Sequence, residues 1–325
     1  MLKRVVLIGL LLITVLSGLI IYRLFFQPVK TNLIDRRDLT GAQPSPLPSW
    51  VIGPIARKLP GRIAFAANPR GQFDIFILEK GAVRPLVQSP DHESYPRFSP
   101  DGRWLAFQRK IHGQWDIFIL ELTTGREIPI ATSRFSEENP TWCDHGRSLV
   151  FDSNQAPRRQ LFRYNLQNHR LDQLTSGAIS KNILAACHPE RPLLAVTSNR
   201  WWGWSLGLFD PVNHHWKMLV RGHSCRPEWS PDGQKLAFVY MGWDHKGDIA
   251  LFDFTTNKPM NLTPSRTHTY DYDPAWSPDG QWIVFQTTTN KKKGNWNLMV
   301  INLKSHAIEP LLTGGFLETY PHWAP

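Results

Sequence analysis

A short phrase that recurs along the chain constrains the fold more than any other feature. It reads DPAWSPDGQWIVF at 273–285, and close copies begin at Tyr95 and Arg226. Two degraded copies begin at Asn139 and Leu184. The Ser-Pro-Asp-Gly centre predicts a tight turn, because Pro presets φ, Asp can bond its own backbone and Gly accepts a positive φ. Each copy therefore predicts a β-hairpin.

The spacing of the copies sets the architecture. A proline, or in one copy an alanine, precedes the turn at the aligned positions Pro96, Pro140, Ala185, Pro227, Pro274 and Pro321. Successive separations are 44, 45, 42, 47 and 47 residues. A period in the forties that is built from short strands is typical of propeller blades.

Each hairpin is followed by an apolar run such as Asp116-Ile117-Phe118-Ile119-Leu120, a polar turn and a short outer strand. Near-continuous apolar runs suit sheets that are covered on both faces, as stacked blades are. Each repeat therefore predicts a blade of four strands, here named A to D from the inside outward. We expect the aspartates that open strand C, Asp74, Asp116 and Asp248, to bond backbone groups there.

The two ends of the chain complete one blade between them. The repeat at 62–87 contains three strands but no innermost strand, whereas 319–325 reads as an innermost strand with nothing after it. We therefore predict an all-β, six-bladed β-propeller of four-stranded blades, closed by the C-terminal strand. Closure of this kind protects sheet edges that would otherwise favour aggregation.

The N-terminus predicts a membrane segment. Residues 5–22 carry no charge, and a helix of that length spans roughly 27 Å, close to the hydrocarbon thickness. The bulky residues at 20–26 disfavour cleavage, so we predict one transmembrane helix within an uncleaved anchor at 1–26; a cleaved signal peptide is the alternative. Lys3 and Arg4 favour a cytoplasmic N-terminus.

A Pro-rich linker follows at 27–61 and the propeller occupies 62–325. Trp50, Val51, Ile52 and Ile55 are expected to dock onto the edge of the propeller. The chain has a net charge of +10, and removing Lys3, Arg4, Arg23 and Lys30 leaves +6 for residues 31–325. That mildly basic surface fits either ordinary solubility charge or an anionic partner.

The three cysteines do not form a disulfide framework. Cys143 and Cys187 fall on innermost strands of neighbouring repeats, and Cys225 lies four strand positions from the level of Cys187. At about 3.3 Å per residue, Cys225 is too far along the strand for an easy bond. We therefore predict that all three are free and mostly buried.

The motif P-x-W-S-P-D-G-x-x-I/L-A-F, followed by D-I-x-x-x-D/N-L, resembles the repeat of TolB-like six-bladed propellers. The resemblance covers about residues 60–325, and the copies at Pro227 and Pro274 match it best. The namesake of that family carries an α/β domain ahead of its propeller, where this chain has the linker and the predicted anchor. Related repeats also occur in prolyl-oligopeptidase-like hydrolases and polysaccharide lyases, so fold alone does not decide function.

The candidate binding face is formed by the loops that join blades and by those between strands B and C. Aromatic side chains rimmed by charge are typical of protein and sugar binding surfaces. The candidates on this face are Tyr95, Glu138, Trp201, Trp202, Trp204, Arg226, Trp243, Asp244, His245, Tyr270, Asp271, Tyr272, Asp273 and Tyr320. Alternatively, Trp201, Trp202 and Trp204 fold down to plug the channel or pack between blades.

No catalytic motif stands out, and we predict no enzymatic activity. G-x-S-x-G, H-E-x-x-H and C-x-x-C are all missing from the sequence. The repeated turn residues are interpreted as structural: Asp101, Gly102, Asp232, Gly233, Asp279 and Gly280. No cofactor is predicted; a Ca²⁺ held by Asp271 and Asp273 near the channel is the alternative.

Lys291, Lys292 and Lys293 form either a solvated charge run or a contact with anionic lipid or glycan, and no nucleic-acid partner is expected. The resemblance and the anchor together indicate a single-pass protein of the bacterial inner (cytoplasmic) membrane with its propeller on the periplasmic side. We predict a non-catalytic, TolB-like propeller that contacts protein partners at the cell envelope. The alternative is a glycan-binding or polysaccharide-processing propeller with a Trp-rich channel mouth.

Overall fold

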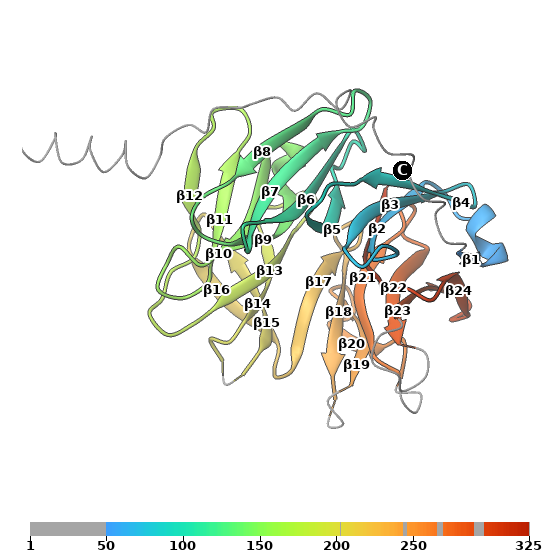
Figure 1. Cartoon of the computed structure of the whole chain (residues 1–325). Coiled ribbons are helices and arrows are strands. Elements are labelled where there is room, and N and C mark those ends of the chain that lie inside the picture. Colours follow the sequence, from blue (N-terminus) through green and yellow to red (C-terminus); the bar gives the residue numbers. More distant parts are fainter. Residues whose placement is uncertain (1–49, 202, 243–245, 265–268, 289–295, 325) are drawn as a thin grey trace, which may run out of the picture. The chain divides into compact units, whose positions relative to one another are not determined.

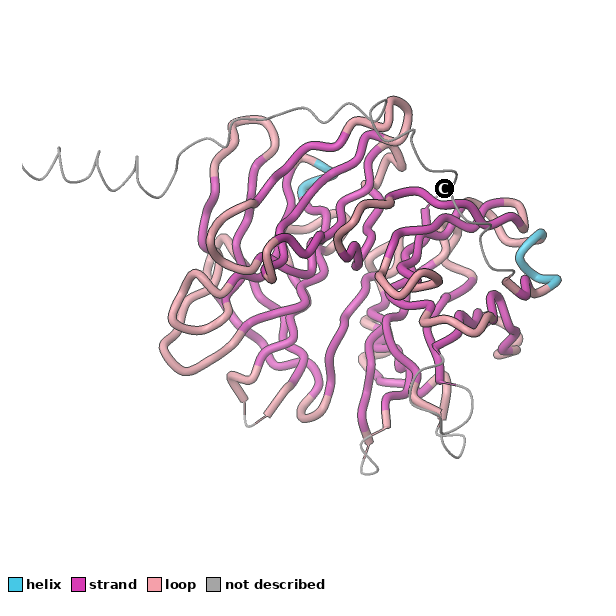
Figure 2. The backbone as a smooth tube through the Cα atoms, viewed as in Figure 1, coloured by secondary structure: helices cyan, strands magenta, loops and turns pink. Residues whose placement is uncertain are grey.

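The computed structural model describes residues 50–324, apart from 202, 243–245, 265–268 and 289–295. Within these residues the chain forms five sheets of four strands and one of five, all antiparallel. Figure 1 shows the sheets set around a common axis, and Figure 2 shows that helix is confined to short turns. The predicted all-β, six-bladed propeller with four-stranded blades is confirmed.

The first three blades follow one another along the chain. Blade 1 comprises β25 (Glu318–Ala324), β2 (Arg62–Ala67), β3 (Asp74–Glu79) and β4 (Ala82–Val87). Blade 2 comprises β5 (His92–Phe98), β6 (Trp104–Ile111), β7 (Gln114–Glu121) and β8 (Glu127–Ala131). Blade 3 comprises β9 (Glu137–Cys143), β10 (Ser148–Ser153), β11 (Gln160–Asn165) and β12 (Leu171–Gln173), with the 3-10 helix η3 (Asp144–Gly146) in its first turn.

The second half of the ring repeats the same order. Blade 4 comprises β13 (Asn182–Cys187), β14 (Leu194–Ser198), β15 (Ser205–Asp210) and β16 (His215–Val220). Blade 5 comprises β17 (Ser224–Trp229), β18 (Lys235–Met241), β19 (Gly247–Asp253) and β20 (Lys258–Asn261). Blade 6 comprises β21 (Asp271–Trp276), β22 (Trp282–Thr288), β23 (Trp296–Asn302) and β24 (Ile308–Thr313), to which β1 (Val51–Ile52) adds a fifth strand.

The ring closes between the two ends of the propeller. Strand β25 pairs with β2 from Arg62 opposite Ala324 to Ala67 opposite Glu318. The C-terminal strand is thus the innermost strand of the N-terminal blade, as predicted from the strand count. This pairing leaves the innermost edge of blade 1 covered.

The core lies between neighbouring blades. Fully buried phenylalanines recur on strands B and C, among them Phe65 and Phe76, whose rings stack at 5.9 Å. Each such ring contributes roughly 1.5–3 kcal/mol relative to leaving it in water. The apolar runs of strands B and C are buried on both faces because another blade covers each side.

Residues ahead of β2 dock onto blade 6 and onto blade 1. β1 pairs with β24, and the 3-10 helix η2 (Pro54–Arg57) buries Ile55. The indole of Trp50 lies against Phe65 and Phe76 and donates to Glu318 Oε1 at 3.1 Å. The expected docking of this segment is confirmed.

The predicted anchor at 1–26 and most of the linker lie outside the described residues. No described helix is both long enough and apolar enough to cross a bilayer.

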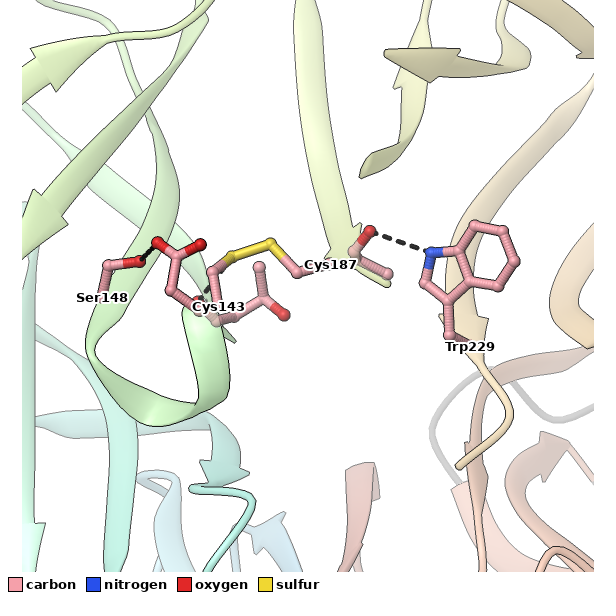
Figure 3. The surroundings of a disulfide bond; sticks show 7 residues. Cys143, Ser148, Cys187 and Trp229 are labelled. Atoms are coloured by element: carbon pink, nitrogen blue, oxygen red, sulfur yellow. Dashed lines mark hydrogen bonds between the residues drawn. A yellow bond between two sulfur atoms is a disulfide. The ribbon is translucent and has the colours of Figure 1, made fainter. Parts of the chain in front are cut away.

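The prediction that all three cysteines are free is wrong for two of them. Cys143 at the end of β9 and Cys187 at the end of β13 form a disulfide, with their Cα atoms 5.4 Å apart (Figure 3). Innermost strands converge on the axis of the ring, so two residues in different repeats come within bonding distance. Cys225 is free, as predicted.

Candidate functional site: the axial channel

The innermost strand of every blade carries a β-bulge at the same position. The bulged residues have φ between 49° and 57°, although none is glycine: Tyr95, Asn139, Leu184, Arg226, Asp273 and Tyr320. Each lies where the register between strands A and B shifts. A bulge redirects the side chain relative to the regular pleat. Four of the predicted site residues thus occupy equivalent positions around the ring.

These bulges also connect neighbouring blades. In four junctions the backbone N–H of the bulged residue donates to a polar side chain on strand B of the preceding blade. The pairs are Asn139 to Gln108 at 2.8 Å, Leu184 to Asp152 at 3.3 Å, Arg226 to Thr197 at 3.2 Å and Tyr320 to Gln286 at 2.9 Å. Each bond satisfies an N–H that the strand ladder leaves free at the bulge.

A charged and aromatic cluster lies at this level of the channel. Arg226 forms an ion pair with the buried carboxylate of Asp273. Burial raises the pKa of Asp273, and the Arg226 guanidinium opposes that rise. The guanidinium also lies 5.6 Å from the ring of Tyr320, which in turn lies 5.4 Å from the ring of Tyr95. Arg226, Asp273, Tyr95 and Tyr320 therefore form one connected cluster.

Aromatic side chains continue outward from this cluster on blade 6. The Tyr272 ring lies 5.7 Å from Trp296 in an edge-on arrangement and 5.9 Å from the Arg226 guanidinium. Tyr270, which precedes β21, is 41% exposed. We call Tyr270, Tyr272 and Trp296 the rim cluster. Trp296 was not among the predicted site residues, although it stands at the start of a strand C beside the loop face.

The remaining candidates on the loop face have individual contacts. Glu138 pairs with Arg159 at 2.7 Å, and Asp271 accepts a bond from Thr287 Oγ1 at 2.5 Å. Trp201 packs on Trp216 at 5.8 Å and fills the space beside Gly207, where a Cβ would come within 2.3 Å of its ring. Trp201 is thus packed against its own blade, which agrees with the alternative that this tryptophan packs rather than faces solvent.

Trp204 is partly buried just before β15. Trp202, Trp243, Asp244 and His245 lie outside the described residues, as do Lys291, Lys292 and Lys293.

The aspartates of the Ser-Pro-Asp-Gly turns hold those turns together. Asp279 Oδ1 accepts bonds from Ser277 Oγ at 2.5 Å and Gln281 N at 3.0 Å, and Gly280 has φ +67°. Asp101 and Asp232 make the equivalent bonds, and the flanking Gly102 and Gly233 also have positive φ. Burial is the largest single effect on both groups and raises the pKa, but the hydrogen bonds and nearby positive charges together outweigh it, so the pKa values of Asp101 and Asp232 are lowered.

The aspartates that open strand C have side-chain neighbours. Asp248 Oδ2 accepts from Asn261 Nδ2 at 2.8 Å, and Asp74 Oδ2 accepts from Gln88 Nε2 at 3.4 Å. Burial raises the pKa of Asp116 to about 7, with the neighbouring Glu137 carboxylate adding to the rise. Glu137 itself is buried and its pKa is also raised to about 7. The junction between blades 2 and 3 thus encloses two carboxyl groups that compete for a proton.

The cavity of the channel lies at the other mouth, where the Ser-Pro-Asp-Gly turns are. Its volume is about 390 Å³, and it is lined by the ends of the innermost strands and the turns that follow them. Arg97, Glu228 and His322 face it together with the indoles of Trp142, Trp229 and Trp276. The sequence analysis did not predict this cavity. A signal was present, because the variable residue x of the P-x-W motif supplies the charged groups that line it.

The tryptophans of the motif connect neighbouring blades at this mouth. Three of the indoles donate through Nε1 to a backbone carbonyl of the preceding blade: Trp142 to Arg97 at 2.8 Å, Trp229 to Ala186 at 3.2 Å and Trp276 to Glu228 at 3.0 Å. The indole of Trp323, at the same position in blade 1, donates to the Pro60 carbonyl at 2.7 Å. Blade 4 has Cys187 at the tryptophan position and is joined to blade 3 by the disulfide instead (Figure 3).

The described residues contain no group of three or more His, Cys, Asp or Glu side chains placed to hold a metal ion. The channel thus offers a rim cluster at one mouth and a polar cavity at the other.

The fold and this site define a six-bladed propeller whose innermost strands carry full or degraded copies of a P-x-W-S-P-D-G repeat. The profile of the TolB beta propeller domain matches residues 60–223, which is half of the chain, and the chain belongs to that family. No curated protein sequence matches this chain.

Solved structures with the same fold include TolB from Acinetobacter baumannii, at 20% identity over 82% of this chain and 67% of that one, with a TM-score of 0.69. A putative TolB from Agrobacterium tumefaciens is 14% identical over 77% of this chain and 87% of that one, with a TM-score of 0.62. An oligogalacturonate lyase in complex with manganese is 15% identical over 76% of this chain and 73% of that one, with a TM-score of 0.53. At these identities the likeness shows the fold alone, which hosts both TolB proteins and an enzyme.

Proposed function

We propose that this chain is a non-catalytic propeller that binds a protein partner at the bacterial cell envelope. The rim cluster carries the proposal. It combines an exposed tyrosine with an edge-on Tyr272–Trp296 pair next to the partly buried Arg226. Aromatic residues beside arginine are the side chains that most often dominate protein interfaces.

The proposal places the propeller on the periplasmic side of the inner membrane, held by residues 5–22. The Cys143–Cys187 disulfide supports that side, because disulfides persist in oxidising compartments and are rare in the cytosol. The uncharged run at 5–22 supports a membrane attachment.

A non-catalytic role is supported by what the polar groups of the motif contact. The repeated aspartates accept bonds within their own turns. The Arg226 and Asp273 side chains pair with each other rather than converging on an empty reaction centre. A glycan-processing role at the rim would need a converging set of such groups. Arg97, Glu228 and His322 do face one cavity at the other mouth, so measuring turnover of a polysaccharide by the wild-type protein tests that role directly.

The test is crosslinking of the full-length protein in its native membrane, followed by pull-down with rim variants. Trp296→Ala and Tyr270→Ala should reduce capture of the crosslinked protein by about tenfold or more, since aromatic anchors at interfaces typically contribute 2 kcal/mol or more. Met260→Ala removes an apolar side chain that is 48% exposed on an outer strand of blade 5 and serves as the matched control. Unchanged capture by both rim variants contradicts the proposal.

The glycan alternative predicts a different result in the same material. Retention on an anionic polysaccharide column that is lost in Trp296→Ala, with no protein crosslink affected, would replace protein binding by glycan binding. Turnover of that polysaccharide by the wild-type protein would contradict the non-catalytic role.

A further inference from the structure

The axial cavity at the turn mouth carries two opposite charges that the fold leaves unpaired with each other. The residue after the repeated proline is Arg97 in blade 2 and Glu228 in blade 5. These blades are three apart in a ring of six, so the two side chains come from opposite sides of the channel. Thr141 and Ala186, at the same position on the blades between them, are small and also line the cavity.

Arg97 is a buried cation that forms no ion pair with a described carboxylate, and its charge acts on Asp273 only from a greater distance. The residue is 7% exposed, and no carboxylate of the described residues lies within 4.0 Å of its guanidinium. Its hydrogen bond is to the carbonyl of the adjacent Pro96 at 3.1 Å, and it stacks 4.2 Å from the ring of Tyr95. By contrast, Arg109, Arg159 and Arg226 each contact a buried carboxylate. A buried guanidinium in a cavity wall favours an anionic ligand.

Glu228 is the complementary anion. Its side chain is 22% exposed, and its nearest cationic candidate is His322 Nε2 at 3.7 Å. The Nδ1 atom of His322 accepts a bond from Phe98 N at 3.1 Å, which leaves the ring proton on Nε2. A neutral imidazole cannot neutralise the Glu228 carboxylate, so this charge is available to a cationic group in the cavity.

The walls between the two charges are aromatic. The indoles of Trp142, Trp229 and Trp276 are fixed by their bonds to neighbouring blades, so their rings form a preformed apolar surface. The cavity of about 390 Å³ falls within the usual range for small-molecule sites.

We propose that the axial cavity binds a small zwitterion of the amino-acid type. Its carboxylate pairs with Arg97, its ammonium group pairs with Glu228, and an apolar side chain lies against the indoles. This site shares no residue with the rim cluster, so the proposal does not depend on whether the rim binds a protein.

The test is calorimetric titration of the purified full-length protein with three matched compounds. L-phenylalanine carries both charges, N-acetyl-L-phenylalanine lacks the ammonium group and L-phenylalaninamide lacks the carboxylate. We expect L-phenylalanine to bind with a Kd of about 1 mM or tighter and each derivative to bind at least about tenfold more weakly. No binding of L-phenylalanine, or equal binding of all three compounds, would overturn the proposal.

Two variants assign the charges. Glu228→Gln, which keeps the side-chain shape, should abolish the preference for L-phenylalanine over its N-acetyl form while retaining the preference over the amide. Arg97→Met should do the reverse, and Arg103→Met, in the exposed part of the adjacent turn, should change neither. If Arg97→Met does not fold, the Glu228→Gln result and the wild-type ligand series still test whether the cavity binds a zwitterion. Unchanged preferences in Glu228→Gln contradict the assignment.

Discussion

Neighbouring blades are joined in two different ways at the turn mouth of the channel. Between blades 2 and 3, 4 and 5, and 5 and 6, a tryptophan indole donates to a carbonyl of the preceding blade. Between blades 3 and 4 the tryptophan is replaced by Cys187, and a covalent bond to Cys143 spans the gap. A hydrogen bond and a disulfide thus join neighbouring blades at the same level of the ring. We infer that these four junctions are strengthened at the turn mouth, in addition to the apolar packing that joins all of them and the bulge hydrogen bonds that join three of them.

The same junctions differ in the polar pair buried at the opposite mouth. Between blades 2 and 3 the pair is Asp116 with Glu137, two carboxyl groups whose mutual repulsion adds to the effect of burial. Between blades 3 and 4 the equivalent pair is Gln160 with Asn182, which form a hydrogen bond of 2.7 Å. The disulfide-linked junction therefore has a neutral, satisfied pair where its neighbour has titratable groups.

Removing the disulfide is expected to have the largest effect. Cys143→Ser with Cys187→Ala removes a crosslink between residues that are 44 positions apart in the sequence. For a loop of that length the chain-entropy relation gives a loss of about 4 kcal/mol in the free energy of unfolding. The measurement is urea unfolding of the double variant beside the wild type, each with and without reductant. Reductant should destabilise the wild type and leave the variant unchanged.

Cys225→Ala is the control for loss of a thiol, because Cys225 is free. A double variant as stable as the wild type would show that the disulfide adds nothing to the hydrogen bonds and packing that also join blades 3 and 4.

The fold could be predicted from the sequence because its signals are local and repeated. Ser277-Pro278-Asp279-Gly280 specifies a turn by itself, and the period of the prolines specifies the blades. Closure by β25 followed from counting strands. The Cys143–Cys187 bond could not be predicted in that way, because it depends on how closely innermost strands converge at the axis. The cavity at the turn mouth was missed for a related reason: strand order does not reveal which mouth is open.

The carboxyl pair is expected to make stability depend on pH. In the folded protein the pKa values of Asp116 and Glu137 are both about 7, whereas unfolded carboxyl groups titrate near pH 4. The folded state therefore holds more protons between about pH 4 and pH 7, so its stability is greatest at the acidic end and falls as pH rises through 7.

The variant Asp116→Gln with Glu137→Asn copies the neutral pair of the next junction. It should reduce the loss of stability between pH 5 and pH 8 by about 2 kcal/mol relative to the wild type. Urea unfolding at the two pH values measures this difference. A wild type and a variant with the same pH dependence would show that the pair titrates normally.

The finest test is to exchange one kind of fastening for the other. Cys187→Trp restores the motif tryptophan in blade 4. Cys143→Ser restores the motif serine in blade 3, at the position that Ser99, Ser230 and Ser277 occupy in other blades. The new indole should donate to the Thr141 carbonyl, which corresponds to the acceptors of Trp142, Trp229 and Trp276. This variant should be more stable than Cys143→Ser/Cys187→Ala by about 1 kcal/mol or more, and reductant should not affect it.

Trp229→Phe is the matched control in an unmodified junction. It removes the bond to the Ala186 carbonyl while keeping an aromatic ring, so it should cost about 1 kcal/mol. Trp229→Phe could be destabilised while Cys187→Trp gives no gain in stability. That result would mean that the indole bond stabilises a junction only where the surrounding residues already accommodate an indole. If neither variant changes the free energy of unfolding, the bond has no role at the junctions and the disulfide is not its substitute.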